Sequence, residues 1–278
     1  RLLLHLLLCC FSVFPLYRFI AFHMLPTITL LNAPIHRITA KDAIEHIITN
    51  ARNGVGGWVV TPNLDILRRL VVDRSFAHLC EGATLRLPDG MPLVWASRLQ
   101  KTPLPERVTG SDLIWSLTAA AAENNLSIFL LGGNPGAASD AASTFTAKHP
   151  ALRIAGTLCP DFGFEKDPAK VRAIVEQVAA TNPDIVYVAL GSPKQEELIK
   201  VLRPALPRTW FLGIGISFSF VSGEVAHAPR WMQRIGLEWF HRLLGDPKRL
   251  FARYIIQGLP FAARLWTVSF FKGLRSRS

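Results

Sequence analysis

The stretch DIVYVALGSPKQEELIKVLRPAL, residues 184–206, decides the fold class because it contains one complete strand-turn-helix unit. Residues 185–190 are apolar without a polar alternation, which is typical of a strand buried on both faces of a parallel sheet. The Gly-Ser-Pro turn at residues 191–193 follows. Residues 194–206 then combine apolar and charged side chains at helical spacing, which indicates an amphipathic helix.

The same unit repeats along most of the chain. Strands are predicted over residues 57–63, 84–90, 126–133, 152–160, 184–193 and 209–215. Helices are predicted over residues 39–52, 64–82, 91–100, 108–125, 134–150, 167–183 and 194–206. Residues 27–38 read as a β-hairpin or as a strand and a turn. Buried strands that alternate with helices indicate a mostly parallel sheet covered on both faces, so the sequence predicts a doubly wound α/β fold.

Three segments differ in composition. Residues 1–25 form an apolar N-terminal extension, residues 26–223 the α/β domain, and residues 224–278 a helical appendage. The apolar run of the extension is interrupted and falls short of the roughly 20 residues that a membrane span needs. We expect it to lie outside the fold; a signal peptide, a membrane-associated helix and translation upstream of a start at Met24 stay open as its origin.

Cationic and aromatic side chains interleave throughout the appendage, which has no strand pattern. The cationic residues are Arg230, Arg234, Arg242, Lys248, Arg249, Arg253, Arg264, Lys272, Arg275 and Arg277. A basic amphipathic segment with Trp and Phe suits a membrane interface or a clamp on phosphate groups. The alternative is a pair of helices packed on the core with solvated arginines.

The composition points to an anionic partner. The 278 residues carry a formal net charge of +11, with an isoelectric point of about 10.0. Such a chain favours nucleic acid, an acidic membrane or a phosphorylated substrate. Cys9, Cys10, Cys80 and Cys159 show no metal-binding spacing, which is typical of reduced thiols in a cytosolic protein.

Small polar residues or glycines follow the predicted strands. The carboxyl ends of parallel strands share one edge of the sheet, where ligands bind in open α/β folds. The residues at that edge include Thr61, Asn63, Asp89, Gly132, Gly133, Gln195 and Glu196. Asp89 is a carboxylate placed directly after a strand, in a Pro-Asp-Gly turn, and is therefore a candidate for proton transfer. Ordinary turn chemistry also explains an Asp-Gly pair.

The other candidates also have structural explanations. Gly132 and Gly133 suit a phosphate cradle, but glycines are common in strand-to-helix turns. Glu196 opens a helix, where an acid interacts favourably with the helix dipole. Arg107 precedes a predicted helix and is equally compatible with a solvated loop. The sequence has no complete dinucleotide-binding or P-loop motif, no zinc-protease or serine-hydrolase motif, and no Asp-x-Asp pair for a divalent ion.

Together, the motifs at these positions resemble the WecG/TagA/CpsF family of bacterial glycosyltransferases, over about residues 26–256. The stretches that carry the resemblance are VVTPNLDIL (59–67), LPDGMPLVW (87–95), ERVTGSDL (106–113), FLLGGNPGAA (129–138), PDIVYVALGSPKQEELI (183–199), GIGISFSFVSGEVAHAPRWMQRIGLEWFHRLL (213–244) and DPKRLFARYI (246–255). The resemblance implies a Rossmann-like fold with a C-terminal helical appendage that completes the active site at the membrane.

It also implies an activity and a set of site residues. Members transfer a sugar from a UDP-sugar to a polyprenyl-diphosphate-linked saccharide, with inversion and without a metal or other cofactor, in cell-surface polysaccharide synthesis. The catalytic aspartate of the family falls on Asp89. Sugar-binding and active-site residues fall on Thr61, Asn63, Arg107 and Gln195, and the arginines that meet the diphosphate fall on Arg242, Arg249 and Arg253. Many members have an aspartate in the GxGxxFD stretch where this chain has Ser219.

The resemblance places the protein on the cytoplasmic face of the bacterial inner membrane, as a peripheral protein on an acidic surface. No nucleic-acid partner is expected, and a homo-oligomer stays open. The alternative function is a basic membrane- or nucleic-acid-binding protein with a non-catalytic α/β domain. The polar residues at successive strand ends argue against that alternative.

Overall fold

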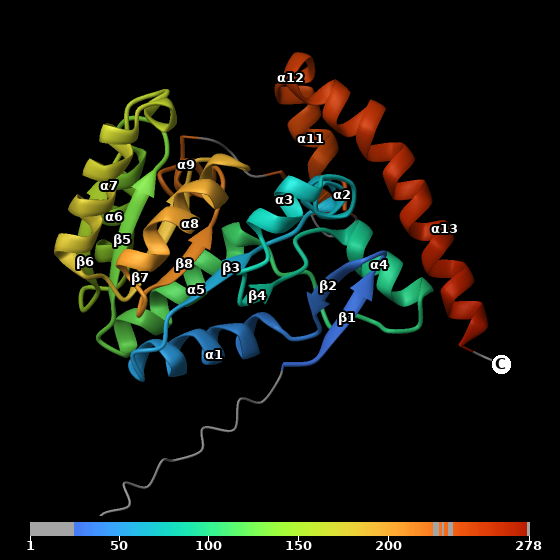
Figure 1. Ribbon diagram of the computed structural model, residues 1–278, viewed down its shortest axis with the longest axis horizontal. Coiled ribbons are helices and arrows are strands. Elements are labelled where there is room, and N and C mark those ends of the chain that lie inside the picture. Colours follow the sequence, from blue (N-terminus) through green and yellow to red (C-terminus); the bar gives the residue numbers. More distant parts are fainter. Residues whose placement is uncertain (1–24, 225–227, 230, 233–235, 277–278) are drawn as a thin grey trace, which may run out of the picture.

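A computed structural model describes residues 25–224, 228–229, 231–232 and 236–276, apart from the side chain of Arg249. Its centre is a six-stranded parallel sheet with the order β4-β3-β8-β7-β5-β6 (Figure 1). The strands are β3 (Gly57–Val60), β4 (Leu85–Arg86), β5 (Ser127–Gly132), β6 (Arg153–Leu158), β7 (Ile185–Ala189) and β8 (Trp210–Gly213). The three central strands β8, β7 and β5 are buried along their whole length, as their unbroken apolar sequences predicted.

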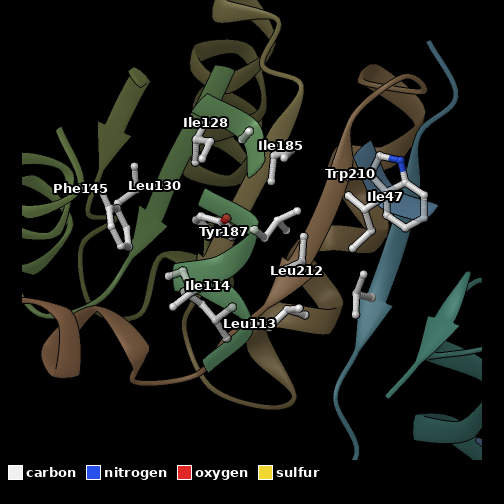
Figure 2. Close-up of a cluster of buried hydrophobic side chains, with 14 of the residues drawn as sticks. Ile47, Leu113, Ile114, Ile128, Leu130, Phe145, Ile185, Tyr187, Trp210 and Leu212 are labelled. Carbon is white, nitrogen blue, oxygen red and sulfur yellow. The ribbon is translucent and has the colours of Figure 1, made fainter. Parts of the chain in front are cut away.

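Helices cover both faces of the sheet. One face packs against α1 (Ala40–Arg52), α5 (Gly110–Glu123), α6 (Ala137–Lys148) and α9 (Ser217–Val221). The other face packs against α2 (Leu64–Val72), α3 (Arg74–Leu79), α7 (Pro168–Thr181) and α8 (Lys194–Ala205). Figure 2 shows the first core, where Tyr187 of β7 lies beside Ile114 of α5. The buried Tyr187 hydroxyl is 3.1 Å from Thr118 Oγ1 and is therefore satisfied. The predicted doubly wound, Rossmann-like α/β fold is confirmed.

A third apolar cluster lies beside the sheet. It joins the antiparallel hairpin of β1 (Thr27–Leu30) and β2 (Ala33–His36) to α4 (Met91–Leu99) and to α13 (Leu259–Arg275). Figure 1 shows α13 running along α4 and the hairpin. The indole N–H of Trp266 donates to the Pro92 carbonyl over 3.1 Å, and a Cβ on Gly273 would lie 2.1 Å from the Leu99 carbonyl oxygen. The last helix is thus packed closely on the helix that follows the Pro-Asp-Gly turn.

The segment between the sheet and α13 consists of α11 (Glu238–Gly245), α12 (Pro247–Phe251) and a π-helical turn, η2 (Ala252–Gly258). A short 3-10 helix, η1 (Phe164–Lys166), precedes α7. The helical character expected after residue 223 is confirmed for the residues that the structure describes, whereas the proposed domain boundary there stays a prediction. Within that same described part, none of the helices has the length and apolar composition that crossing a membrane requires.

One predicted helix is wrong. The stretch 64–82 forms two helices, α2 and α3, because Asp73 interrupts it with an extended backbone. Its carboxylate accepts the backbone N–H groups of Ser75 and Phe76 at 3.0 and 3.1 Å and so caps a new helix. The hairpin alternative for residues 27–38 is confirmed. The expectations for residues 1–24 lie outside the described residues.

Candidate active site

Backbone hydrogen bonds hold Asp89 at the carboxyl edge of the sheet. The Asp89 N–H donates to the Pro62 carbonyl over 2.9 Å, which places the turn after β4 against the segment after β3. The N–H of Val108 donates to the Pro88 carbonyl over 2.8 Å and brings the segment before α5 to the other side. A Cβ on Gly90 would lie 3.9 Å from Asn63 Cα, so the turn packs closely on that residue. The structure therefore brings three of the predicted polar segments together at Asp89.

Asp89 is partly buried as a residue. Burial, followed by the negative charge of Glu238, raises the pKa of Asp89 from an ordinary value of 3.8 to about 7. The guanidinium groups of Arg242 and Arg107 and a hydrogen bond from the Gly110 N–H oppose this rise. A carboxyl group whose pKa lies near neutrality is suited to accept a proton at physiological pH.

Two arginines and one acid form a charged cluster beside Asp89. Arg107 Nη1 lies 3.1 Å from Glu238 Oε2, and Arg242 Nη2 lies 2.5 Å from Glu238 Oε1. Arg107 also faces the exposed carboxylate of Asp112 at 3.8 Å. The guanidinium of Arg242 lies 5.6 Å from the centre of the Phe220 ring. Because Glu238 and Arg242 belong to α11, the appendage contributes directly to the surroundings of Asp89.

Thr61 and Asn63 lie in the segment that directly follows β3. Thr61 is buried, and its Oγ1 would be 3.6 Å from a Cβ on Gly110 at the start of α5. The Oδ1 atom of Asn63 caps α2 by accepting the N–H groups of Asp65 and Ile66 at 3.1 and 3.0 Å. This cap does not use the Nδ2 amino group of Asn63, which is a hydrogen-bond donor; its contact with a ligand stays a prediction. The capping role was not anticipated from the sequence, although an Asn before an apolar periodic run is a typical N-cap signal.

Gln195 and Glu196 are buried at the start of α8. Gln195 Oε1 accepts the Gly215 N–H over 3.1 Å, and Gln195 Nε2 donates to Glu196 Oε1 over 2.9 Å. A Cβ on Gly213 would lie 2.6 Å from Gln195 Nε2, so a larger residue there would displace the Gln195 amide. Burial raises the pKa of Glu196. The amide of Gln195 therefore anchors the loop after β8, and a direct substrate contact of either side chain stays a prediction.

The glycines at the carboxyl end of β5 have a packing role. Gly132 has a φ of +99°, and a Cβ there would lie 2.6 Å from the Ala189 carbonyl oxygen. Gly133 has a φ of +84°, and its Cβ would lie 3.2 Å from the Phe218 ring. Both positions thus require glycine for the backbone itself. Their predicted contact with a ligand stays a prediction.

Arg253 of the appendage contacts α2. Arg253 Nη2 is 2.8 Å from Asp65 Oδ2, and Arg68 Nη2 is 3.3 Å from Asp65 Oδ1. Arg253 therefore pairs with a carboxylate that lies two positions after Asn63 in the chain. Arg249 belongs to α12, and its side chain lies outside what the structure describes.

Two charged residues, Glu238 beside Asp89 and Arg68 beside Asp65, were not singled out from the sequence. Glu238 carries a detectable signal, since Glu followed by Arg at i+4 is a favourable helical pair. Arg68 lies among other charged residues of a helix and gives no comparable signal. In the described ranges, no group of three or more His, Cys, Asp and Glu side chains could hold a metal ion. The site therefore offers one carboxyl group with a near-neutral pKa, hydroxyl and amide groups, and guanidinium groups for an anion.

Comparison with known proteins identifies the family of this chain. Residues 28–274 match the model of the glycosyl transferase WecG/TagA/CpsF family. An N-acetylglucosaminyldiphosphoundecaprenol N-acetyl-beta-D-mannosaminyltransferase from Bacillus subtilis (strain 168) is 35% identical over 195 residues, which are 70% of this chain and 74% of the relative. A protein of the same name from Bacillus spizizenii (strain ATCC 23059 / NRRL B-14472 / W23) is 34% identical over 194 residues, which are 70% of this chain and 73% of the relative. The chain therefore belongs to the WecG/TagA/CpsF family and is a glycosyltransferase.

Proposed function

We propose that this protein transfers an N-acetylhexosamine, N-acetylmannosamine first among the candidates, from a UDP-sugar to a polyprenyl-diphosphate-linked saccharide. The names of both Bacillus relatives state an N-acetyl-β-mannosaminyl group and an N-acetylglucosaminyl-diphosphoundecaprenol acceptor. The family match over residues 28–274 includes the segments that carry the site, which supports a related donor and acceptor here. The product would enter a cell-surface polysaccharide.

Asp89 is the observation that carries the proposal. It lies at the carboxyl edge of the sheet, is only partly buried as a residue, and has a pKa that burial raises to about 7. At pH 7.5 about three quarters of such groups are ionised, which is the state a general base needs. Thr61, Asn63 and Arg107 converge on the same position from two other chain segments.

In the proposed reaction, an acceptor hydroxyl oxygen attacks C1 of the donor sugar while the bond from C1 to the UDP oxygen breaks. Asp89 accepts the hydroxyl proton, and the UDP leaves with one additional negative charge. Arg107 and Arg242 stabilise that charge, as preorganised cations do in phosphate-transfer sites. A single displacement inverts C1, so an α-linked UDP-sugar gives a β-linked product, in agreement with the linkage in the relatives' name.

The appendage supports a peripheral position on an acidic membrane. Exposed large apolar side chains gather there: Phe251, Ile256, Leu259, Val268, Phe270, Phe271 and Leu274. Arg264, Lys272 and Arg275 are exposed on the same part of the chain. Apolar side chains next to cations suit the headgroup region of an anionic bilayer. This position would bring the site to its lipid-linked acceptor.

The test uses the full chain with an Asp89→Asn substitution, UDP-N-acetylmannosamine, and an N-acetylglucosamine diphosphate lipid. A positioned general base contributes about 10²–10⁴-fold in rate, and we expect a loss of turnover in that range. Turnover within threefold of the unmodified protein would exclude Asp89 as the base. A product with an α linkage would exclude single displacement.

A further inference from the structure

Glu238 connects the core of the protein to its appendage. It is the first residue of α11 and lies 131 positions after Arg107 in the sequence. One of its carboxylate oxygens contacts Arg107 of the core at 3.1 Å, and the other contacts Arg242 of the appendage at 2.5 Å. One carboxylate thus orients two guanidinium groups from different parts of the chain.

Burial separates this contact from an ordinary surface ion pair. The side chains of Glu238 and Arg107 are 21% and 18% exposed, whereas Asp112, the other acid near Arg107, is 68% exposed. Interactions between charges strengthen as water is removed from around them, and exposed pairs contribute little. Glu238 is therefore the carboxylate that governs the position and the effective charge of Arg107.

We propose that Glu238 is a positioning residue of the transfer reaction, which holds Arg107 and Arg242 beside Asp89 and keeps Asp89 a strong enough base. This inference rests on the proposed role of Asp89 as the base. Glu238 itself need not touch the substrate, because it acts through the two cations and through its own charge.

The charged groups around Asp89 give the sign of the effect. Glu238 faces Asp89 from α11 with a negative charge, and Arg242 from α11 and Arg107 from the core face it with positive charges. Tyr254 acts on Arg242 from η2, and Asp112 acts on Arg107 from α5. Without the Glu238 charge, both arginines lose the carboxylate that balances them, and Asp89 loses a neighbouring anion. Both changes lower the pKa of Asp89 and weaken it as a base.

The experiment compares the pH dependence of kcat/KM for the unmodified protein, Glu238→Gln and Glu238→Asp. The acidic limb of this profile reports the pKa of the base in the free enzyme, so we expect it near pH 7 in the unmodified protein. In Glu238→Gln we expect the limb to move down by about one to two pH units, with a lower plateau. Glu238→Asp keeps the charge on a shorter side chain, and its limb should stay near that of the unmodified protein. Asp112→Asn is the matched control, whose exposed charge is screened, and its limb should not move.

A lower plateau in Glu238→Gln without a shift of the limb would reduce Glu238 to a structural residue and overturn the inference. A limb that moves equally in the Gln and Asp variants would also overturn it, since the charge would then not be the cause. These failures differ from a failure of the proposed function, in which Asp89→Asn itself keeps its activity. Urea unfolding gives a readout without turnover. The pH-dependent part of the stabilisation by Asp89→Asn should shrink in a Glu238→Gln background.

Discussion

Replacing Asp89 by Asn should stabilise the protein while removing its activity, and the stabilisation should depend on pH. The carboxyl group of Asp89 has a pKa of about 7 in the folded protein and an ordinary value of 3.8 when unfolded. A raised carboxyl pKa means that the folded state holds its proton more tightly than the unfolded state does. The contribution of this group to the free energy of unfolding is then fully present below pH 3.8 and is lost as the pH rises toward 7. Asn is neutral at all pH values and avoids this loss.

The magnitude follows from the two pKa values. One pKa unit corresponds to about 1.36 kcal/mol, so the difference between 3.8 and about 7 gives an upper value of about 4 kcal/mol above pH 7. At pH 5 the unfolded carboxyl is already ionised, and about 1.5 kcal/mol of this loss is present. The stabilisation by Asp89→Asn should therefore grow by about 2–3 kcal/mol between pH 5 and pH 8, or by about 5–10 °C in Tm.

Urea unfolding of both proteins at pH 5 and pH 8 measures this difference. Other groups with shifted pKa values, such as His36 and His46, whose pKa values burial lowers, are common to both proteins and cancel. Asp112→Asn serves as the control, because its exposed carboxylate should give the same difference at both pH values. The raised pKa would be refuted if Asp89→Asn changed the free energy of unfolding equally at pH 5 and pH 8, or if the variant were less stable than the unmodified protein at pH 8.

Three further predictions concern the rest of the site and the appendage. Asn63→Ser keeps an oxygen that caps α2 and should leave the free energy of unfolding near that of the unmodified protein, whereas Asn63→Ala should lower it by about 1 kcal/mol. Both variants should lose transfer activity, because both lack the Nδ2 donor. Urea unfolding and a transfer assay of the two variants separate the cap from the ligand contact. EDTA should leave turnover unchanged if cationic side chains stabilise the UDP, and a loss restored by Mg²⁺ or Mn²⁺ would contradict this. Replacing Phe270 and Phe271 by Ser should weaken flotation with anionic vesicles at least tenfold, since burial of one such side chain contributes about 1.5–3 kcal/mol. Phe162→Ser removes an even more exposed aromatic side chain outside the appendage and should not weaken it.

The local sequence was sufficient for most of the sheet and its helices. Unbroken apolar runs such as Val186–Ala189 can only be buried between two layers, and the intervening helices carry caps such as Thr39 and Thr109. The sequence was insufficient at Asp73, because the apolar periodicity continues across the break between α2 and α3. The competition between a side-chain cap and a continuing helix depends on how the following turn packs.

The sequence also singled out Asp89, since turn chemistry, strand-end position and family resemblance all converge on it. Only the tertiary structure decided the state of that carboxyl group. Its pKa depends on burial and on Glu238, Arg242 and Arg107, which meet across more than 130 residues of chain. Coulomb interactions depend on distance in space and on exclusion of water, and neither is encoded in a local pattern. A sequence can therefore name the acid, but the packing of the appendage against the core sets its strength as a base.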